Sequence, residues 1–420
     1  MVDNLANLEE RLPPAQLKKE VLILGGGFSG TKLASFLARH DVKVTVIERG
    51  EKQDSYFCLD DKTFLRSDLV PENVTFLPKS TLVKLSGHLG SFQATITTEG
   101  NRVVIEPSVI VIATGYSKKK ESTFLPPGKT IFLEELAELL KESKAESLTF
   151  KGRKIDRISF IFDQVNDDIK IPFFLLFKTL LSLKSRFSCE TYVFCKDVKV
   201  SFPSGERLYR KAREEGVLFF KYEDFPAFSD EREDFLITWE EKGRDPSLSV
   251  NLRSDLLVIP EHIFPGDASS LSAITGIPLN KGGYLMEDNP QFLSILTNRK
   301  GIYVLGGCHF PHLFTEVEKL AYATATEILK LFYGDTYHPS FPLAQVDPQK
   351  CALCYTCVRI CPHKAVTIEK YAERNIYYIK GNSLSWYAAY IERMACFGCG
   401  ICIAECPARA ISFIEDEVKQ

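Results

Sequence analysis

The 420-residue sequence lacks several features that would place it outside the ordinary soluble proteins. It has no strong excess of charge, because the formal net charge is −3, and we therefore expect no nucleic-acid partner. It has no apolar run long enough to cross a bilayer: the longest, Ile171 to Leu183, contains a lysine and is too short, so we expect no membrane span. The first residues, MVDNLANLEERLPP, are polar and acidic, unlike a secretory signal. What remains is typical of a globular protein of two or three domains, with 45% hydrophobic and 25% charged residues.

Cysteine is scarce outside two short stretches. Of the 12 cysteines, only Cys58, Cys189, Cys195 and Cys308 lie elsewhere. The other eight form two copies of one closely spaced pattern, and no secretory signal precedes them. This clustering favours metal ligation in a reducing compartment over disulfides.

A glycine-rich turn is present near the start of the chain. Gly25, Gly27 and Gly30 form G-x-G-x-x-G directly after the apolar run VLIL and before a helical pattern. Gly25 permits the tight turn, Gly27 lets a pyrophosphate approach the backbone, and Gly30 allows close packing of helix and strand. Glu48 follows where a carboxylate can bind a ribose hydroxyl, and a purely steric origin for the glycines is less favoured. The remaining candidates here are Phe28, Ser29 and Arg49.

Two later stretches indicate FAD rather than NAD in this turn. VIATGY (111–116) and GIYVLGG (301–307) resemble the crossover and the late strand of flavoproteins that have two dinucleotide-binding domains. The alternative is a pair of ordinary core strands that end at glycine. In such flavoproteins the helix after Phe314 points its N-terminus at the flavin, where its dipole stabilises negative charge. His309 and His312 either serve the flavin or satisfy local backbone, and we favour the second role; Cys308 is expected to be a buried thiol. The predicted flavin-binding residues of these stretches are Ala113, Thr114, Gly115, Gly306, Gly307, His312 and Phe314.

A second α/β pattern begins near Lys151. Its first strand, RISFIF, is followed by DQVNDDIKIP, which contains no glycine. Without glycine the backbone cannot approach a pyrophosphate closely, so we predict a domain that resembles an NAD-binding domain but binds no nicotinamide nucleotide.

The two cysteine stretches have the spacing of bacterial two-cluster ferredoxins, C-x2-C-x2-C-x3-C-P. In that arrangement three cysteines of one stretch share a cluster with the last cysteine of the other. Zinc is the alternative, but zinc sites lack the x3-C-P ending and its duplication. We therefore predict two [4Fe-4S] clusters, one held by Cys351, Cys354, Cys357 and Cys406, and the other by Cys396, Cys399, Cys402 and Cys361.

The spacer between the cysteine stretches indicates a hairpin, VTIEK and IYYIKG, and then a helix, SLSWYAAYIERMA. Trp386, Tyr387 and Tyr390 either shield a cluster, contact a partner subunit or pack internally, and packing is the favoured role.

The predicted fold is α/β, with two dinucleotide-binding-type domains like those of flavoprotein disulfide reductases and then a small α+β two-cluster ferredoxin domain. We expect a polar lead-in at 1–19, a discontinuous FAD-binding domain at 20–150 and 267–334, and the NAD-binding-like domain at 151–266. A linker is expected at 335–348 and the ferredoxin domain at 349–420.

Over most of its length the chain resembles the heterodisulfide reductase A-like family of flavin and iron-sulfur proteins, which includes bacterial relatives. The resemblance runs through GGGFSG, LDDKTF (59–64), TLVKLSGHLGSFQATI, GERLYRKAREEGVLFF, GIYVLGG and the cysteine tail. It implies a cytoplasmic FAD protein bound to other redox subunits and, because relatives often form dimers, a homodimer. The sequence departs from the family after LDDKTF, where LRSDLVPEN lacks the usual paired cysteines. This chain is therefore expected to bind one flavin and to end in one ferredoxin-like domain.

The function expected from these features is electron transfer. A flavin transfers two electrons and each cluster transfers one. A protein that holds both can therefore convert between two-electron and one-electron transfer. We expect an oxidoreductase subunit of a heterodisulfide reductase-like complex, with ferredoxin or another carrier as a further partner and substrate reduction in a partner subunit. The alternatives are a self-sufficient FAD-dependent ferredoxin or NAD(P)H oxidoreductase, and a scaffold without FAD. The missing second glycine turn and the missing paired thiols argue against the first, and the intact glycine turn with Glu48 argues against the second.

Overall fold

The computed structural model describes residues 15–51, 72–120, 126–142, 147–162, 170–241, 248–291, 293–334, 336–339, 342–371 and 386–414. The chain divides into two compact units, Met1–Tyr116 with Pro265–Gln420, and Ser117–Phe264. LDDKTF, Cys58, most of DQVNDDIKIP and the first 14 residues lie outside the described residues. No helix among the described residues is both long enough and apolar enough to span a membrane.

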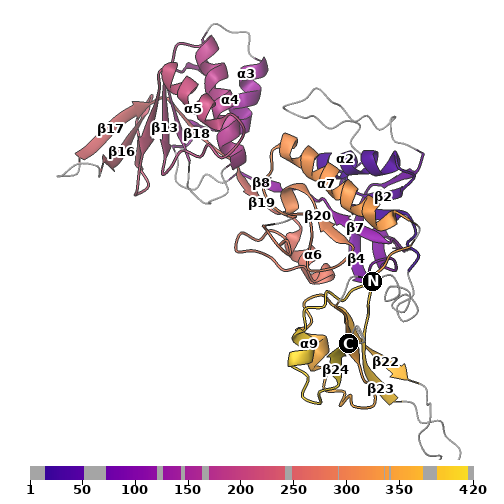
Figure 1. Cartoon of the computed structure of the whole chain (residues 1–420). Helices are drawn as coiled ribbons and strands as arrows, with labels where there is room; N and C mark the ends of the chain where they lie inside the picture. Colours follow the sequence, from indigo (N-terminus) through magenta and orange to yellow (C-terminus); the bar gives the residue numbers. More distant parts are fainter. Residues whose placement is uncertain are drawn as a thin grey trace, which may run out of the picture. The chain divides into compact units, whose positions relative to one another are not determined.

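A parallel five-stranded sheet forms the centre of the first unit (Figure 1). Its order is β20-β7-β1-β2-β3, so the strands that are central in space come from distant parts of the chain. The strands are β1 (Glu20–Leu24), β2 (Lys43–Ile47), β3 (Val74–Leu77), β7 (Val109–Ile112) and β20 (Ile302–Val304).

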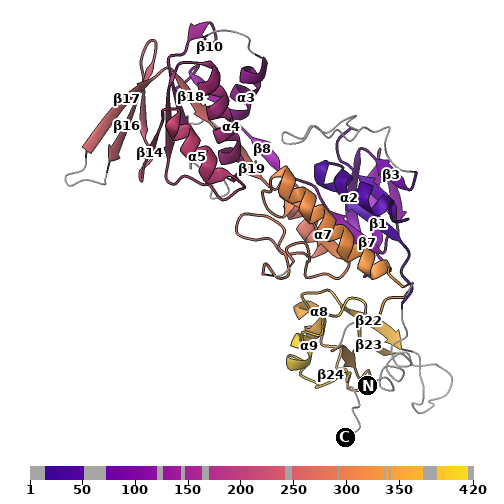
Figure 2. The same cartoon turned by 45° about the horizontal axis from the view of Figure 1, so that its top comes forward.

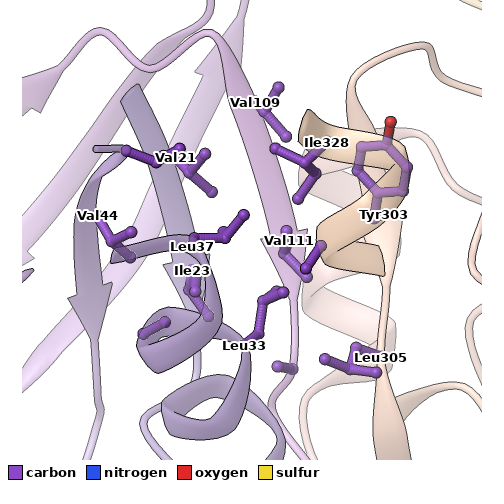
Figure 3. Packing of buried hydrophobic residues seen from close by; sticks show 14 of the residues in the cluster. Val21, Ile23, Leu33, Leu37, Val44, Val109, Val111, Tyr303, Leu305 and Ile328 are labelled. Atoms are coloured by element: carbon purple, nitrogen blue, oxygen red, sulfur yellow. The ribbon is translucent and has the colours of Figure 1, made fainter. Parts of the chain in front are cut away.

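Alternate residues of these strands face two different layers. Val21 and Ile23 contact the helices α2 (Phe28–Ala38) and α7 (Phe314–Phe332), as Figure 3 shows for Leu33, Leu37 and Ile328. Leu22 and Leu24 face the opposite layer, which is an antiparallel meander with the helix α6 (Ala268–Thr275). Each fully buried side chain contributes roughly 1.5–3 kcal/mol. The meander strands are β4 (Ser80–Ser86), β5 (Gln93–Thr98) and β6 (Asn101–Ile105).

The second unit also has a parallel five-stranded sheet, in the order β14-β13-β12-β18-β9 (Figure 2). The strands are β9 (Thr130–Phe132), β12 (Arg157–Ile161), β13 (Glu190–Cys195), β14 (Val217–Lys221) and β18 (Leu256–Ile259). The helices are α3 (Leu133–Glu142), α4 (Lys170–Arg186) and α5 (Gly205–Glu214). An antiparallel sheet of β15 (Ala227–Asp230), β16 (Phe235–Glu241) and β17 (Leu248–Ser254) shares a core with the parallel sheet. Two short antiparallel pairs are also present: β10 (Thr149–Phe150) with β11 (Arg153–Lys154), and β8 (Ser117–Lys119) with β19 (His262–Phe264).

The border between the units differs from the one expected at 150/151. The structure places 117–150 in the second unit, because β9 pairs in parallel with β18 and α3 packs on α4. The apolar face of α3 therefore covers the second sheet, with Leu133, Leu136 and Leu140 buried. The periodicity of the sequence predicts α3 itself, but a helix pattern does not say which of two sheets the helix covers.

The cysteine-rich part of the chain is a small pseudo-symmetric fold within the first unit. Its strands are β21 (Ala344–Val346), β22 (Val366–Tyr371), β23 (Trp386–Ile391) and β24 (Ile411–Phe413), and its short helices are α8 (Thr356–Ile360) and α9 (Ile401–Ala404). The strand β21 pairs with β24, and β22 pairs with β23, both antiparallel.

The structure of this part differs from the expectations at two places. The segment expected to be a linker contains the strand β21, and Leu343 beside it is fully buried in the cysteine-rich core. The predicted helix SLSWYAAYIERMA is a strand over Trp386–Ile391. Aromatic and β-branched residues favour strands, and Ala388 and Ala389 are buried while Tyr387 is exposed.

Candidate flavin and iron-sulfur sites

The glycine turn after β1 is sterically restricted at two of its three glycines. Gly25 has φ +108°, and a Cβ there would lie 2.4 Å from the oxygen of Ala113. A Cβ on Gly30 would lie 2.0 Å from the oxygen of Gly25. A Cβ on Gly27 would meet nothing within 4 Å, so the space above the start of α2 is open. This arrangement fits a pyrophosphate at the N-terminus of α2.

Glu48 lies beside this turn at the end of β2. Its Oε2 accepts a hydrogen bond from the Gly26 amide at 2.7 Å, and its Oε1 accepts one from Gly50 at 3.0 Å. Each carboxylate oxygen keeps further acceptor capacity for a ribose hydroxyl. The next residue, Arg49, is an exposed side chain that pairs with Asp267 at the start of α6. The structure therefore gives Arg49 a protein partner, which the sequence did not reveal.

The crossover after β7 and the turn after β20 meet the glycine turn. A Cβ on Gly306, which has φ +75°, would lie 2.2 Å from the Ser29 Oγ. A Cβ on Gly307 would lie 2.5 Å from the ring of Tyr116 and 3.0 Å from the carbonyl carbon of Gly115. Three segments that are far apart in sequence thus converge at the carboxyl ends of β1, β7 and β20. The intervening Ala113 is buried and its amide donates to Leu24, and Thr114 follows it.

The N-terminus of α7 lies next to that of α2. The ring of Phe314 packs edge-on against Phe28, with ring centroids 5.0 Å apart. The Glu316 carboxylate accepts a hydrogen bond from the Leu313 amide at 2.9 Å, and His312 Nδ1 lies 3.7 Å from the same carboxylate. The first residues of α2 and α7 are therefore in contact.

His309 and Cys308 have structural roles in this turn. His309 Nδ1 lies 3.0 Å from the Leu285 carbonyl and 3.5 Å from the Glu287 carboxylate, and its side chain is buried. Cys308 donates to the Ile112 carbonyl at 3.2 Å, and burial raises the pKa of its thiol to about 11. A thiol with this pKa is almost entirely protonated near neutral pH, which makes it a poor nucleophile.

The eight clustered cysteines surround two separate cavities. We call Cys351, Cys354, Cys357 and Cys406 the first cysteine set, because together they line one cavity. We call Cys361, Cys396, Cys399 and Cys402 the second cysteine set, because they line the other. Each set thus combines three cysteines of one stretch with the last cysteine of the other.

Backbone amides donate to two sulfurs of each set. Ala389 donates to Cys351 at 3.5 Å and Ala410 to Cys406 at 3.3 Å. In the second set, Ala365 donates to Cys361 and Gly398 to Cys396, both at 3.4 Å. Such bonds stabilise thiolates and the clusters they hold.

Burial and neighbouring thiolates disfavour the thiolate form of a cysteine in the second cysteine set. Burial, together with the nearby Cys396 and Cys361 thiolates, raises the pKa of Cys402 to about 11. A bound metal centre offsets this cost, because metal binding holds cysteines as thiolates at neutral pH. Among the described residues, no group of three or more His, Cys, Asp or Glu side chains is arranged to hold a single metal ion. Each cavity is lined by four cysteines, which is the number of thiolate ligands that a [4Fe-4S] cluster takes.

Comparisons with known proteins agree with this arrangement. The family described as pyridine nucleotide-disulphide oxidoreductase matches residues 2–127, and the 4Fe-4S dicluster domain matches residues 350–411. The chain is 24% identical over 316 residues to a heterodisulfide reductase A-like protein of Archaeoglobus profundus, covering 66% of this chain and 44% of that one. It is 27% identical over 189 residues to the iron-sulfur A-type subunit of the CoB–CoM heterodisulfide reductase of Methanocaldococcus jannaschii, covering 44% and 28%.

Among solved structures, the thioredoxin reductase of Lactococcus lactis has a TM-score of 0.47 and 15% identity, covering 74% of this chain and 98% of that one. The chain spans less than half the length of the two curated relatives named above. The two matching family models account for the flavin-type fold and the cysteine-rich tail respectively. Over part of its length the chain is similar to A-type subunits of heterodisulfide reductases, and residues 2–127 and 350–411 match the pyridine nucleotide-disulphide oxidoreductase and 4Fe-4S dicluster families.

Proposed function

We propose that the chain is a cytoplasmic FAD and iron-sulfur electron-transfer subunit of a heterodisulfide reductase-like complex. It holds one FAD and two [4Fe-4S] clusters and exchanges electrons with other redox subunits, with ferredoxin or a similar carrier as a further partner. Substrate reduction takes place in a partner subunit. The curated relatives are named as reductase subunits, which supports this assignment. The homodimer expected from the resemblance stays a prediction.

The observation that supports the proposal is that a glycine turn and two cysteine-lined cavities occur in one compact unit. The turns after β1, β7 and β20 converge around open space at Gly27, and the cysteine tail of the same unit surrounds two cavities. When bound, the flavin supplies two-electron chemistry and the clusters supply one-electron chemistry. The N-termini of α2 and α7 stabilise negative charge at the flavin, and the backbone amides at the cysteine sulfurs stabilise the clusters.

A flavin enzyme that reduces disulfides by itself is the second candidate. That chemistry needs a pair of thiols beside the flavin, and in the described part of the chain Cys308 is a single, buried thiol there. Its high pKa further disfavours nucleophilic attack on a disulfide. Electron transfer through the clusters needs no such pair.

Cofactor content is the test of the proposal. We expect about eight irons and about one FAD per chain after anaerobic purification and reconstitution. Iron, acid-labile sulfide and flavin are measured on the same sample. Four irons or fewer in fully reconstituted protein would contradict the two clusters, and protein without flavin would favour a scaffold.

A further inference from the structure

A short turn before β20 holds the cysteine-rich part against the rest of the first unit. We call residues Thr297–Lys300 the docking segment. Thr297 is buried, and its Oγ1 donates to the Ile302 carbonyl at 2.8 Å and accepts from the Arg299 amide at 3.1 Å. These bonds fix the turn, so that the side chains on it are presented in a defined direction.

The docking segment contacts the surroundings of the second cysteine set. Asn298 Nδ2 donates to the Pro362 carbonyl at 2.6 Å, and the Asn298 carbonyl lies 2.7 Å from His363 Nδ1. Pro362 and His363 directly follow Cys361. The ring of His363 stacks on Phe397, with centroids 4.1 Å apart. Each of these contacts lies next to Cys361 or Cys396.

Two cations of the docking segment lie beside this set. The Lys300 ammonium group donates to the carbonyl oxygen of Cys396 and lies 5.2 Å from the centroid of the Phe397 ring. Arg299 is only 7% exposed, and its guanidinium donates to the carbonyls of Thr275 at 2.7 Å and Gly87 at 3.1 Å. Burial lowers the pKa of the Arg299 guanidinium, and the Cys361 thiolate opposes this effect. A guanidinium stays charged in proteins, so this site carries a buried positive charge.

The cations near the first cysteine set are in a different environment. Lys350 is 67% exposed and forms an ion pair with Asp347 at 3.0 Å, and Arg359 is exposed. Exposed charges act through water and are screened by salt, whereas buried charges are screened much less. Both sets receive two backbone N–H bonds. The Cys354 thiol donates to the Thr356 hydroxyl at 3.4 Å, but this neutral contact at an exposed thiol weighs less than the buried Arg299 guanidinium and the half-buried Lys300 ammonium group.

We propose that Arg299 and Lys300 raise the reduction potential of the cluster held by the second cysteine set above that of the cluster held by the first. The proposal rests on the proposed function, because it requires both clusters. Reduction adds one negative charge to a cluster, and a buried cation stabilises the reduced form more than the oxidised form. In the balanced step, the cluster of the first set loses one electron and the cluster of the second set gains it. The second set therefore retains an electron shared between the two.

The test is a potentiometric titration of the reconstituted full chain, followed by electron paramagnetic resonance. Lys300→Gln removes a charge, Lys300→Arg keeps it, and Lys350→Gln is the matched control at the first set. We expect Lys300→Gln to lower one cluster potential by at least about 28 mV, a threefold change in its one-electron equilibrium at 59 mV per tenfold. We expect Lys300→Arg to restore the potential and Lys350→Gln to leave both potentials unchanged. Cys399→Ser, which alters only the second cluster, identifies the signal that shifts.

The outcomes separate this proposal from the proposed function. Four irons or fewer in the fully reconstituted, unmodified chain would overturn both. Eight irons with no shift in Lys300→Gln, or with an equal shift in Lys350→Gln, would overturn this proposal alone. A shift in the signal that is unaffected by Cys399→Ser would also overturn it. The iron content of each variant shows that the clusters are intact, so that an unfolded variant is not mistaken for a shifted one.

Discussion

At the scale of single residues, the glycines and cysteines carry most of the argument. Gly25 and Gly30 are required by close backbone contacts, but Gly27 is next to open space. The steric roles of the three glycines could be predicted from the sequence, because the spacing G-x-G-x-x-G relates directly to a strand–turn–helix geometry. The partner of Arg49 could not, because Asp267 is more than two hundred residues away.

Gly27 is the position where a negatively charged side chain should weaken flavin binding without unfolding the protein. Gly27→Glu places a carboxylate in the open space where the pyrophosphate is expected, at the N-terminus of α2. We expect FAD affinity to fall at least about tenfold, which corresponds to about 1.4 kcal/mol. Gly27→Ala is the control for an added side chain without charge and should weaken binding less than Gly27→Glu. Fluorescence titration of the apoprotein with FAD measures both, and equal affinities for the two variants would contradict the assignment.

The cysteine sets make a prediction about which cluster each cysteine holds. Cys406 lines the cavity of Cys351, Cys354 and Cys357, so Cys406→Ala should damage that cluster although it lies far along the chain. Cys361→Ala should damage the cluster of Cys396, Cys399 and Cys402. Mössbauer and paramagnetic resonance spectra of the two variants, compared with Cys354→Ala and Cys399→Ala, show which signal is lost. If each loss fell on the cluster of the neighbouring cysteines in sequence, the crossed arrangement would be wrong.

At the scale of secondary-structure elements, local sequence patterns predicted whether a segment is a helix or a strand better than they predicted which sheet it joins. Apolar runs that are visible in the sequence coincide with the strands β1, β7, β12, β13 and β20. The strand Trp386–Ile391 was expected to be a helix, because YAAYI allows either period over so few residues. Whether β9 and α3 join the first or the second sheet depends on long-range pairing with β18, which leaves no local signal.

The position of β9 leads to a stability prediction. Lys129, which directly precedes β9, is 9% exposed and donates to Asp230 at 2.7 Å, to the Glu231 carbonyl and to the Asp234 carbonyl at 2.7 Å. Lys129→Met removes a buried ammonium group from these part-buried acceptors, and we expect the unfolding free energy of the second unit to fall by about 1–3 kcal/mol. Flavin and iron content should be unchanged.

The control for this change is Lys154→Met. Lys154 forms an ion pair with Asp156, and the two side chains are 65% and 62% exposed. Loss of this ion pair should therefore lower the unfolding free energy by no more than about 0.5 kcal/mol. Urea denaturation followed by circular dichroism measures both variants. A Lys129 variant as stable as the Lys154 variant, or one that loses flavin, would contradict the placement of β9 in the second unit.

At the scale of the whole molecule, the second unit has a parallel sheet in which β12 is followed by DQVNDDIKIP, a stretch without glycine. We therefore predict that neither NADH nor NADPH reduces the flavin of the isolated chain at a rate that supports turnover. NADPH is the more demanding test, because Arg207 and Arg210 line a pocket after β13. Stopped-flow absorbance at the flavin band measures the rate, with dithionite as the positive control. Rapid bleaching by either nucleotide would favour the self-sufficient oxidoreductase.

The presence of both kinds of redox centre in one chain is the central claim, and an anaerobic reductive titration tests it most directly. Dithionite is added in small steps to the reconstituted chain while flavin absorbance and cluster paramagnetic resonance are recorded together. The account predicts that the chain takes up about four electrons, two at the flavin and one at each cluster, and that reduced-cluster signals appear. An uptake of only two electrons with no cluster signal, or the absence of flavin bleaching, would contradict it.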